Sequence, residues 1–427
     1  MEINLAFGKN GLKLQLPDGP RYDVVHARSA AGLVDSAAAI AAALDAPIGR
    51  PPLEEMARGK KTAAISVCDI TRPAPNRITL PPLLERLHRA GLKREDITIC
   101  IATGLHRVAT PDELITILGP EIAANYPIFN HDAKDDDAHR EIGTTKRGTP
   151  VVISKPFLDA DLHITLGFIE QHLMLGFSGG RKLIAPGLAH QRTIKKIHAP
   201  RFMREARAVE GSIDDNPLHA ELLEIAAMER HDFMLDVTLT PGREISGVFA
   251  GEPVLAHAAG VRFMRDSSVE WLPEQVDAVI TTAAGHPLDL TFYQTIKGVT
   301  AAEHIVKPGG PILTVSECAE GLGSPEYIEM LDSYNGAQEF LDSIADTPVV
   351  PDQWQLEKMA LVARKHPLLF YTPGAEANRV GAVGEASFSS IDEAVAALLA
   401  KLPANARIAV IPEGPYAFAR VQEMALA

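Results

Sequence analysis

Short runs of apolar residues alternate with stretches of helical spacing along most of the chain. Ala63–Asp69 (AAISVCD) and Ile97–Ala102 (ITICIA) are rich in β-branched residues and have the length of buried strands. Between them, the apolar residues of Leu80–Ala90 recur at the spacing of one helix face. This order of strand, helix and strand predicts parallel sheets covered by helices. Further strands are predicted at Val151–Ser154, Leu162–Leu166, Phe233–Leu239 and Glu244–Phe249.

The same alternation starts again in the last part of the chain. Val276–Thr282 (VDAVITT) is a predicted strand that follows the polar, turn-rich segment Asp266–Glu274, where we place a domain boundary. We therefore expect an α/β protein of two domains, residues 1–270 and 271–427, each built on a largely parallel sheet flanked by helices. Because open parallel sheets bind ligands beyond the carboxyl ends of their strands, the active site is expected in the interdomain cleft. The remaining strands of the second domain are predicted at Pro311–Val315, Leu368–Tyr371 and Ile408–Ile411.

Composition narrows the class of protein and its partners. A length of 427 residues with 46% hydrophobic and 22% charged residues is typical of a globular chain of two or three domains. The formal net charge of −14 argues against nucleic acid and anionic membranes, which bind basic surfaces. No apolar stretch is long enough to cross a bilayer, and the first residues lack a signal-peptide pattern. Together with three widely spaced cysteines, Cys68, Cys100 and Cys318, this predicts a cytoplasmic protein.

Two polar motifs directly follow the first two predicted strands. Asp69, Thr71 and Arg72 of DITRPAPN offer a carboxylate, a hydroxyl and a guanidinium that could hold a ribose, a phosphate or a carboxylate. A rigid capping turn explains the same residues equally well. His106 of ATGLHR could act as a general base near neutral pH, although a lone histidine is more often a packing residue.

A third polar segment begins after the strand at Leu162–Leu166. It contains EQH, with His172, then GFSGGRK, and then His198 at the end of a predicted helix, Gln191–His198. Glycines ahead of a helix expose backbone N–H groups to a phosphate, but a tight turn packed on a sheet would need the same glycines. The spacing is not that of a Walker A loop and no GxGxxG follows a strand, which disfavours nucleoside triphosphates and NAD.

A fourth motif lies in the second predicted domain. Tyr293, Gln294 and Lys297 of YQTIK, with Trp354 further along, could form the wall of a site for a small polar anion. Taken singly, the two aromatic residues are more typical of a core.

In this order, DITRPAPN, ATGLHR, EQH, GFSGGRK, His198 and YQTIK resemble the motifs of the nickel-dependent lactate racemase family, which comprises racemases and epimerases of 2-hydroxyacids. The resemblance implies a nickel pincer nucleotide, pyridinium-3,5-bisthiocarboxylic acid mononucleotide with Ni(II), attached covalently to Lys182. It also implies that His198 is the metal ligand and that the proteins which build and insert the cofactor are partners. One imidazole is sufficient, because the pincer fills three positions of a square-planar Ni(II).

The resemblance further implies a mechanism in which hydride transfer gives a 2-keto acid intermediate. Hydride removal avoids a carbanion beside a carboxylate, and inversion in both directions requires two bases, to which His106 and His172 correspond. The implied substrate contacts are Arg72, Tyr293, Gln294, Lys297 and Trp354, and the implied cofactor contacts are Lys182, Asp69, Thr71, Ser178, Gly179 and Gly180.

The chain departs from the family pattern beside the second histidine. Gln171 stands where proline is usual, and Leu173-Met174-Leu175 replaces aromatic and small residues. A 2-hydroxyacid larger or more polar than lactate therefore fits as well. The alternatives are a non-catalytic binder of the nickel cofactor or of a hydroxyacid, which would not need both histidines, and an NAD-type 2-hydroxyacid dehydrogenase, which the missing dinucleotide motif disfavours.

Overall fold

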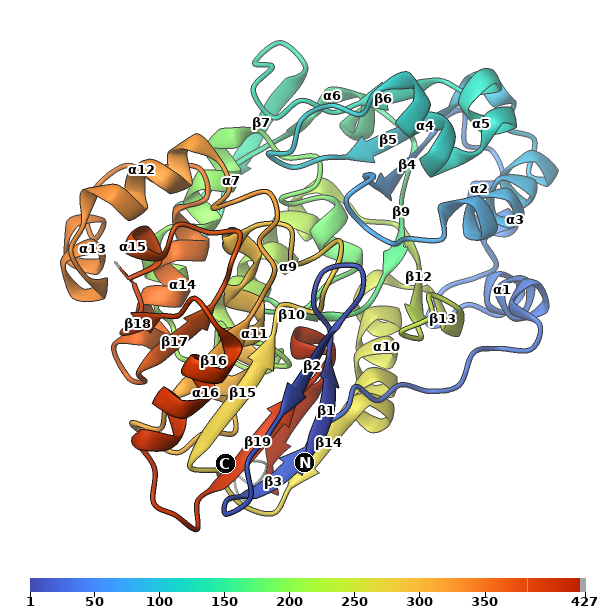
Figure 1. Ribbon diagram of the computed structural model, residues 1–427. Helices are drawn as coiled ribbons and strands as arrows, with labels where there is room; N and C mark the ends of the chain where they lie inside the picture. Colours follow the sequence, from blue (N-terminus) through green and yellow to red (C-terminus); the bar gives the residue numbers. More distant parts are fainter. Residues whose placement is uncertain (382, 423–427) are drawn as a thin grey trace. The chain divides into compact units, whose positions relative to one another are not determined.

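The computed structural model describes residues 1–381 and 383–422, which form two compact units. The larger unit consists of Ser29–His198 and Glu205–Ser267. The smaller unit consists of Met1–Arg28, Ala199–Arg204 and the described residues from Ser268 onwards. Figure 1 shows the course of the chain through both units. In the described part of the chain, no helix has the length and apolar character needed to cross a membrane.

The larger unit is built on a six-stranded sheet with the order β13-β12-β9-β4-β5-β6. Neighbouring strands are parallel except for β13, which runs antiparallel to β12. All residues of β4 and β9 are buried, as is usual for central strands covered on both faces. The largely parallel sheet predicted from the sequence is therefore confirmed. The strands are β4 (Ala63–Cys68), β5 (Ile97–Ala102), β6 (Ile128–Asn130), β9 (Leu162–Phe168), β12 (Phe233–Leu239) and β13 (Ile245–Gly251).

Helices cover this sheet with their apolar faces. In α3 (Asn76–Arg89), Leu80, Leu83, Leu84 and Leu87 recur at helical spacing and are buried in the same core as the sheet. The other helices are α1 (Ser36–Asp45), α2 (Leu53–Ala57), α4 (Pro111–Leu118), α5 (Pro120–Asn125), α6 (Lys155–Leu158), α7 (Gln191–Ile197), α9 (Pro217–Glu229) and α10 (Pro253–Ser268). Two antiparallel pairs complete the unit, β7 (His139–Thr144) with β8 (Pro150–Ser154) and β10 (Gln171–His172) with β11 (Gly176–Phe177).

The smaller unit is built on a second six-stranded sheet, with the order β18-β17-β16-β15-β19-β3, in which all neighbours are parallel. Its strands are β3 (Arg21–Val24), β15 (Ala278–Thr282), β16 (Ile312–Val315), β17 (Leu368–Tyr371), β18 (Ala386–Ser387) and β19 (Arg407–Ile411). Two further pairs are β1 (Glu2–Leu5) with β2 (Leu12–Gln15) and β14 (Val269–Leu272) with β20 (Phe418–Val421). The helices are α8 (Pro200–Met203), α11 (Ile296–Glu303), α12 (Pro325–Ser333), α13 (Ala337–Ser343), α14 (Gln353–Ala363), α15 (Ala377–Val380) and α16 (Ile391–Ala400).

The division of the chain differs from the expected domains 1–270 and 271–427 at its beginning. A break near Ser268 lies close to the expected boundary, but Met1–Arg28 and Ala199–Arg204 belong to the smaller unit. The reason for the first segment is strand pairing, because β3 forms the edge of the second sheet beside β19. Such a pairing joins the two ends of the chain and leaves no mark on local periodicity.

The strand order of the larger unit brings three of the motifs together. Parallel neighbours end at the same edge of a sheet, and β9, β4 and β5 are consecutive in the order. Asp69 follows β4, Thr103 follows β5 and Ile169 follows β9. The three polar loops therefore lie at one edge, with the DITRPAPN loop in the middle.

Candidate active site

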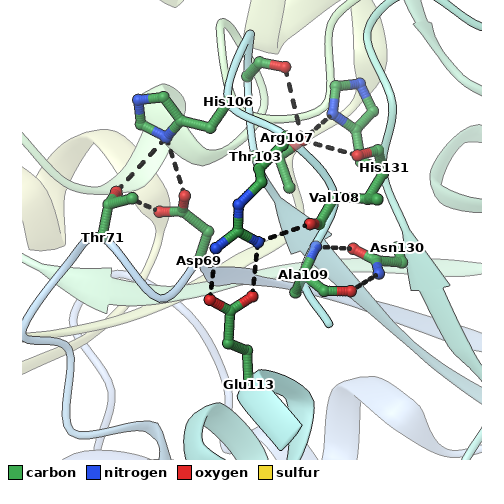
Figure 2. Close-up of polar contacts among 11 residues, drawn as sticks. Asp69, Thr71, Thr103, His106, Arg107, Val108, Ala109, Glu113, Asn130 and His131 are labelled. Carbon is green, nitrogen blue, oxygen red and sulfur yellow. Dashed lines mark hydrogen bonds and ion pairs between the residues drawn. The ribbon is translucent and has the colours of Figure 1, made fainter. Parts of the chain in front are cut away.

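His106 and Asp69 form a hydrogen-bonded pair at this edge (Figure 2). Nδ1 of His106 lies 2.8 Å from Oδ2 of Asp69, and the Thr71 hydroxyl donates to Oδ1 of the same carboxylate at 2.8 Å. Because an ionised carboxylate only accepts, Nδ1 carries the proton and Nε2 keeps its lone pair. The Asp69 side chain is 5% exposed and that of His106 46% exposed, so a buried carboxylate orients an imidazole that a ligand can reach.

Opposing effects act on the pKa of Asp69. Burial would raise it, but the hydrogen bond and charge of His106, the charge of Arg72 and the Thr71 hydroxyl outweigh burial, and the pKa lies below its ordinary value. Asp69 is therefore ionised at neutral pH. In the structure both Asp69 and Thr71 contact His106, and the cofactor contacts that the resemblance implies for them stay a prediction.

The loop that carries His106 is fixed by polar contacts on both sides (Figure 2). Arg107 makes a two-pronged ion pair with Glu113 of α4, at 2.6 and 2.7 Å. The Asn130 side chain, at the end of β6, accepts from the Ala109 N–H at 3.1 Å and donates to the Ala109 carbonyl at 2.7 Å. Together these contacts hold the loop against two neighbouring elements. They reduce the freedom of His106, which is a requirement for a positioned base.

The GFSGGRK segment forms a tight turn ahead of the short 3₁₀-helix η2 (Gly180–Leu183). Gly179 has a φ of +86°, and a Cβ at this position would lie 2.2 Å from Oδ2 of Asp236 in β12. The Gly180 N–H donates to that oxygen at 2.7 Å, and the Ser178 hydroxyl donates to a carbonyl of β9 at 2.9 Å. The Ser178 hydroxyl and the Gly180 N–H are therefore hydrogen-bonded within the protein, and the cofactor contacts that the resemblance implies for these residues stay a prediction. These hydrogen bonds hold the turn against the sheet.

Asp236, which none of the four motifs contained, contacts the glycine turn. It is fully buried in β12, and burial raises its pKa to about 7 although the N–H of Gly180 and the charge of Arg181 lower it. Its carboxylate fixes the glycine turn from the sheet side. The sequence signal is a single carboxylate in an otherwise apolar strand, FMLDVTL, because a buried carboxylate requires a partner.

His172, Lys182 and His198 line one small cavity within the larger unit. The cavity has a volume of about 30 Å³. Lys182 comes from η2, His172 from the end of β10, and His198 from the residue that ends α7. The structure therefore brings together three residues that lie in separate motifs. The remaining lining residues are Met174, Leu175, Pro186, Ile197, Leu218 and Leu222.

His198 is held in one tautomer by its own helix. Its Nδ1 donates to the Ile194 carbonyl at 2.8 Å, so the lone pair is on Nε2. Burial lowers the pKa of His198 to about 4, and the charge of Lys182 acts in the same direction against the Ile194 hydrogen bond. The side chain is a neutral imidazole at neutral pH, which is the form that binds metal ions.

His172 is held in the opposite tautomer. Its Nδ1 accepts hydrogen bonds from the backbone N–H groups of Met174 and Leu175, both at 3.3 Å. In the neutral ring the proton is then on Nε2. His106 presents a lone pair at Nε2 and His172 presents a proton there, so one can accept a proton where the other can donate.

The four remaining predicted residues lie in the smaller unit and are described there by themselves. Tyr293 and Gln294 belong to the 3₁₀-helix η3 (Phe292–Gln294), Lys297 to α11, and Trp354 to α14. Tyr293 and Trp354 meet through a side-chain hydrogen bond, and burial raises the pKa of Tyr293 well above its usual value. Oε1 of Gln294 is buried, with no hydrogen-bond partner among the described residues.

Comparison with known proteins identifies the family of the chain. Residues 7–211 match the family model of the lactate racemase N-terminal domain, and residues 272–417 match that of the lactate racemase C-terminal domain. A lactate racemase of Lactiplantibacillus plantarum is 36% identical over 375 residues, which are 87% of this chain and 88% of that protein. The chain belongs to the lactate racemase family.

Further members of the lactate racemase family extend the likeness. A lactate racemase of Thermoanaerobacterium thermosaccharolyticum is 32% identical over 418 residues, which are 96% of this chain and 97% of that protein. The structure of the lactate racemase apoprotein from the same organism has a TM-score of 0.92 at 31% identity and covers 98% of this chain and 100% of its own. A Thermotoga maritima protein with a TM-score of 0.65 and 16% identity shares the fold. These relatives support a racemase function, which is an isomerase activity.

Proposed function

We propose that the protein inverts the C2 carbon of a 2-hydroxyacid by hydride transfer with a nickel pincer nucleotide attached to Lys182, and that lactate is the first substrate to test. The names of the relatives support the racemase part of the proposal. The observation that carries the finer part is the cavity that His172, Lys182 and His198 line together. An amine, an imidazole in its metal-binding form and a proton donor converge there.

The donor set of this cavity fits the cofactor. Lys182 would hold the nucleotide through its amine, and Nε2 of His198 would be the protein ligand of nickel. A neutral histidine whose other nitrogen donates to a carbonyl is the usual form of a metal ligand. When bound, the nickel pincer nucleotide supplies an acceptor and donor of hydride. A volume of about 30 Å³ is far below the range of about 300–1,000 Å³ that is usual for sites of small organic ligands, so most of the nucleotide would lie outside this cavity.

The two other histidines would move the protons. His106, with its lone pair at Nε2, would take the proton of the substrate hydroxyl, and His172 would return a proton to the oxygen from its doubly protonated imidazolium form when the keto acid is reduced on its other face, because loss of Nε2–H from the neutral ring would leave an imidazolate. One turnover in either direction takes a proton at one histidine and returns it at the other. Such a cycle requires the two histidines to differ in protonation at the start, which the opposite tautomers of His106 and His172 support. It also requires one histidine on each side of the substrate, which the positions of their loops on either side of the β4 loop support.

The five predicted substrate contacts remain part of the proposal. Arg72 would bind the carboxylate, because its guanidinium follows β4 between the two histidine loops and offers a planar fork. The unpartnered Oε1 of Gln294 supports a role in ligand binding, since buried amide oxygens are normally hydrogen-bonded. Lys297 would bind the carboxylate or the hydroxyl oxygen, and Tyr293 and Trp354 would shape the pocket.

The proposal is tested on protein co-expressed with the enzymes that build the cofactor. Intact-mass analysis should show an adduct that is absent from Lys182→Arg, with nickel bound in proportion to the adduct. Loaded protein should interconvert the enantiomers of lactate, or of another acid in a chiral screen of malate, aromatic and sugar-derived 2-hydroxyacids, without net oxidation.

Two variants separate the parts of this proposal. His106→Asn should keep the adduct and nickel but lose racemisation, whereas His26→Asn, at an exposed histidine of the smaller unit, should keep all three. Racemisation by an unmodified, nickel-free chain would overturn the proposal that the reaction requires the cofactor. If the modified chain exchanges or inverts no acid in the screen, the proposed catalysis is wrong and the protein only binds the cofactor.

A further inference from the structure

A second and much larger cavity lies in the larger unit, lined mainly by α9 and α10. Its volume is about 650 Å³, within the range of about 300–1,000 Å³ that is usual for sites of small organic ligands. None of the predicted site residues lines it, and it shares no lining residue with the cavity of Lys182. It is therefore a distinct feature of the same unit.

A buried cation lies at this cavity. The Arg181 side chain is 2% exposed, and its terminal nitrogens donate to four backbone carbonyls and lie 2.7 Å from Nε2 of His257. Burial lowers the pKa of Arg181 to about 9, so the guanidinium is still charged at neutral pH. Its Nε has no hydrogen-bond partner among the described residues. Neutral carbonyls satisfy most donors of this cation, and the charge that acts on it is that of the buried Asp236 carboxylate, whose own pKa burial raises to about 7.

A second unpartnered group lies beside it. His219 is 9% exposed, lines the cavity, and stacks on His257 with a centroid separation of 6.1 Å and an interplanar angle of 23°. Nδ1 of His219 is buried and has no hydrogen-bond partner in the described part of the chain. Burial lowers the pKa of His219 to about 3, so the ring is neutral and carries one N–H. A buried nitrogen without a partner is the exception in folded proteins.

Arginines slightly outnumber carboxylates among the charged residues that line the cavity. Four arginines line it, against three carboxylates. Asp214 pairs with Arg265 at 3.5 Å, and Glu252 accepts from the Leu255 N–H at the start of α10 at 2.8 Å. Arg262, exposed on α10, makes no ion pair with any described residue. An approaching anion therefore meets the guanidinium of Arg262 at the surface and that of Arg181 in the interior, alongside the carboxylates of Glu252 and Asp266.

The walls between these charges are apolar. Leu223 and Ala226 of α9 face the cavity together with Val254, Ala258 and Val261 of α10. Binding of an apolar ligand to such a surface is favourable, because it removes apolar area from water. A purely inorganic anion would leave this surface without a partner.

We infer that the α9–α10 cavity binds a small organic carboxylate with an apolar body longer than that of lactate, its carboxylate toward Arg181 and His219 and its apolar part between the two helices. The occupant would contact the segment that carries Lys182, because Arg181 and Lys182 are consecutive residues of η2. The site is independent of the proposed racemase activity, and its occupancy is measured on protein without the cofactor.

The test is a titration with octanoate followed by saturation-transfer NMR, with octanamide and inorganic phosphate as probes that each lack one feature. Octanoate should bind saturably, and both other probes should bind at least tenfold more weakly. Ala258→Trp places a large side chain at the cavity, and Ala220→Trp places the same side chain on an exposed position of α9 outside it. The first should weaken octanoate binding at least tenfold, and the second should change it less than twofold.

His219→Phe keeps a ring of similar shape and removes both ring nitrogens, so it should also weaken octanoate binding while the thermal unfolding midpoint stays close to that of the parent. Three results would overturn the inference. The first is the absence of octanoate binding at millimolar concentration. The second is equal binding to the Ala258→Trp and Ala220→Trp variants. The third is binding of octanamide or phosphate as strong as that of octanoate.

Discussion

Asp69 and His106 meet through a 2.8 Å contact between a buried carboxylate oxygen and an imidazole nitrogen, although 37 residues separate them in the chain. The contact exists because β4 and β5 are parallel neighbours, so that the residues following them lie at one sheet edge. It sets the tautomer of His106 and thus decides which nitrogen can act as a base. Asp69 is a positioning residue in this arrangement, since it acts through the histidine.

Replacing Asp69 by Asn should lower kcat of the loaded enzyme by on the order of 10²-fold, because general base catalysis typically contributes about 10²–10⁴-fold and requires the correct tautomer. KM should change little. Thr71→Val removes a hydroxyl from the same carboxylate but leaves the Asp69–His106 contact, so it serves as the control and should keep most of the activity. ¹⁵N chemical shifts of His106 report the tautomer directly. A drop in kcat with an unchanged tautomer would contradict the positioning role.

Replacing His198 by Gln should separate metal binding from attachment of the cofactor. The adduct on Lys182 should remain in the mass spectrum, while the nickel bound per adduct falls. Loss of partners that only orient a metal ligand costs about 10–100-fold in affinity, so loss of the ligand itself should cost at least that much. Metal analysis after dialysis against a chelator measures the difference. Full nickel retention by His198→Gln would mean that another group is the ligand.

The strands were the most predictable part of the fold. β5, β12 and β17 have the bounds that their apolar runs predicted, because a strand covered on both faces is apolar along most of its length. β3 could not be predicted, since RYDV is half-buried or exposed at a sheet edge and pairs with β19 near the other end of the chain. Periodicity reports burial along one segment but not which distant segment lies beside it.

The candidate residues were recognisable as motifs, whereas their partners were not. Asp69 and Thr71 both contact His106, a partner that the motifs did not reveal, and their predicted role at the cofactor stays a prediction. The sequence did not reveal the contacts of Asp236 or the cavity between α9 and α10, because both depend on which helices and strands become neighbours. Residue types and spacing indicate what chemistry is present. The hydrogen-bond partners follow only from the tertiary packing.

A buried pair away from these cavities should make the stability of the protein depend on pH. His163 and Glu229 are in contact, and the other ring nitrogen of His163 donates to the Ala160 carbonyl at 2.8 Å. A single proton shared between Nδ1 of His163 and the Glu229 carboxylate is therefore needed to form a hydrogen bond between them. Burial raises the pKa of Glu229 to about 7, and the Glu229 hydrogen bond and charge raise that of His163 against the effect of burial.

Both folded-state pKa values lie above the unfolded ones, so the folded protein keeps a proton that the unfolded chain releases. For Glu229 the stabilisation is complete below about pH 4.5, falls as the pH rises, and is lost once the pH passes its folded-state pKa of about 7. The free energy of unfolding should fall by roughly 2–3 kcal/mol over this range relative to Glu229→Gln, which cannot titrate. Urea unfolding of both proteins at several pH values measures the difference. Parallel pH profiles for the two would show that the pair does not share such a proton.

The glycine turn ahead of Lys182 offers a test of close packing. Gly179→Ala should destabilise the protein by about 2–4 kcal/mol, because a Cβ there would lie 2.2 Å from the buried Asp236 carboxylate and φ is +86°. Gly59 is a matched control with φ of +79° and no atom within 4 Å of a Cβ, so Gly59→Ala should lose only the backbone contribution of about 1–2 kcal/mol. Urea unfolding at one pH gives both values. The difference between the two losses of stability measures the contact with Asp236. Equal losses would mean that the turn shifts away from β12 without cost. In that case the Asp236 carboxylate does not fix the position of Lys182.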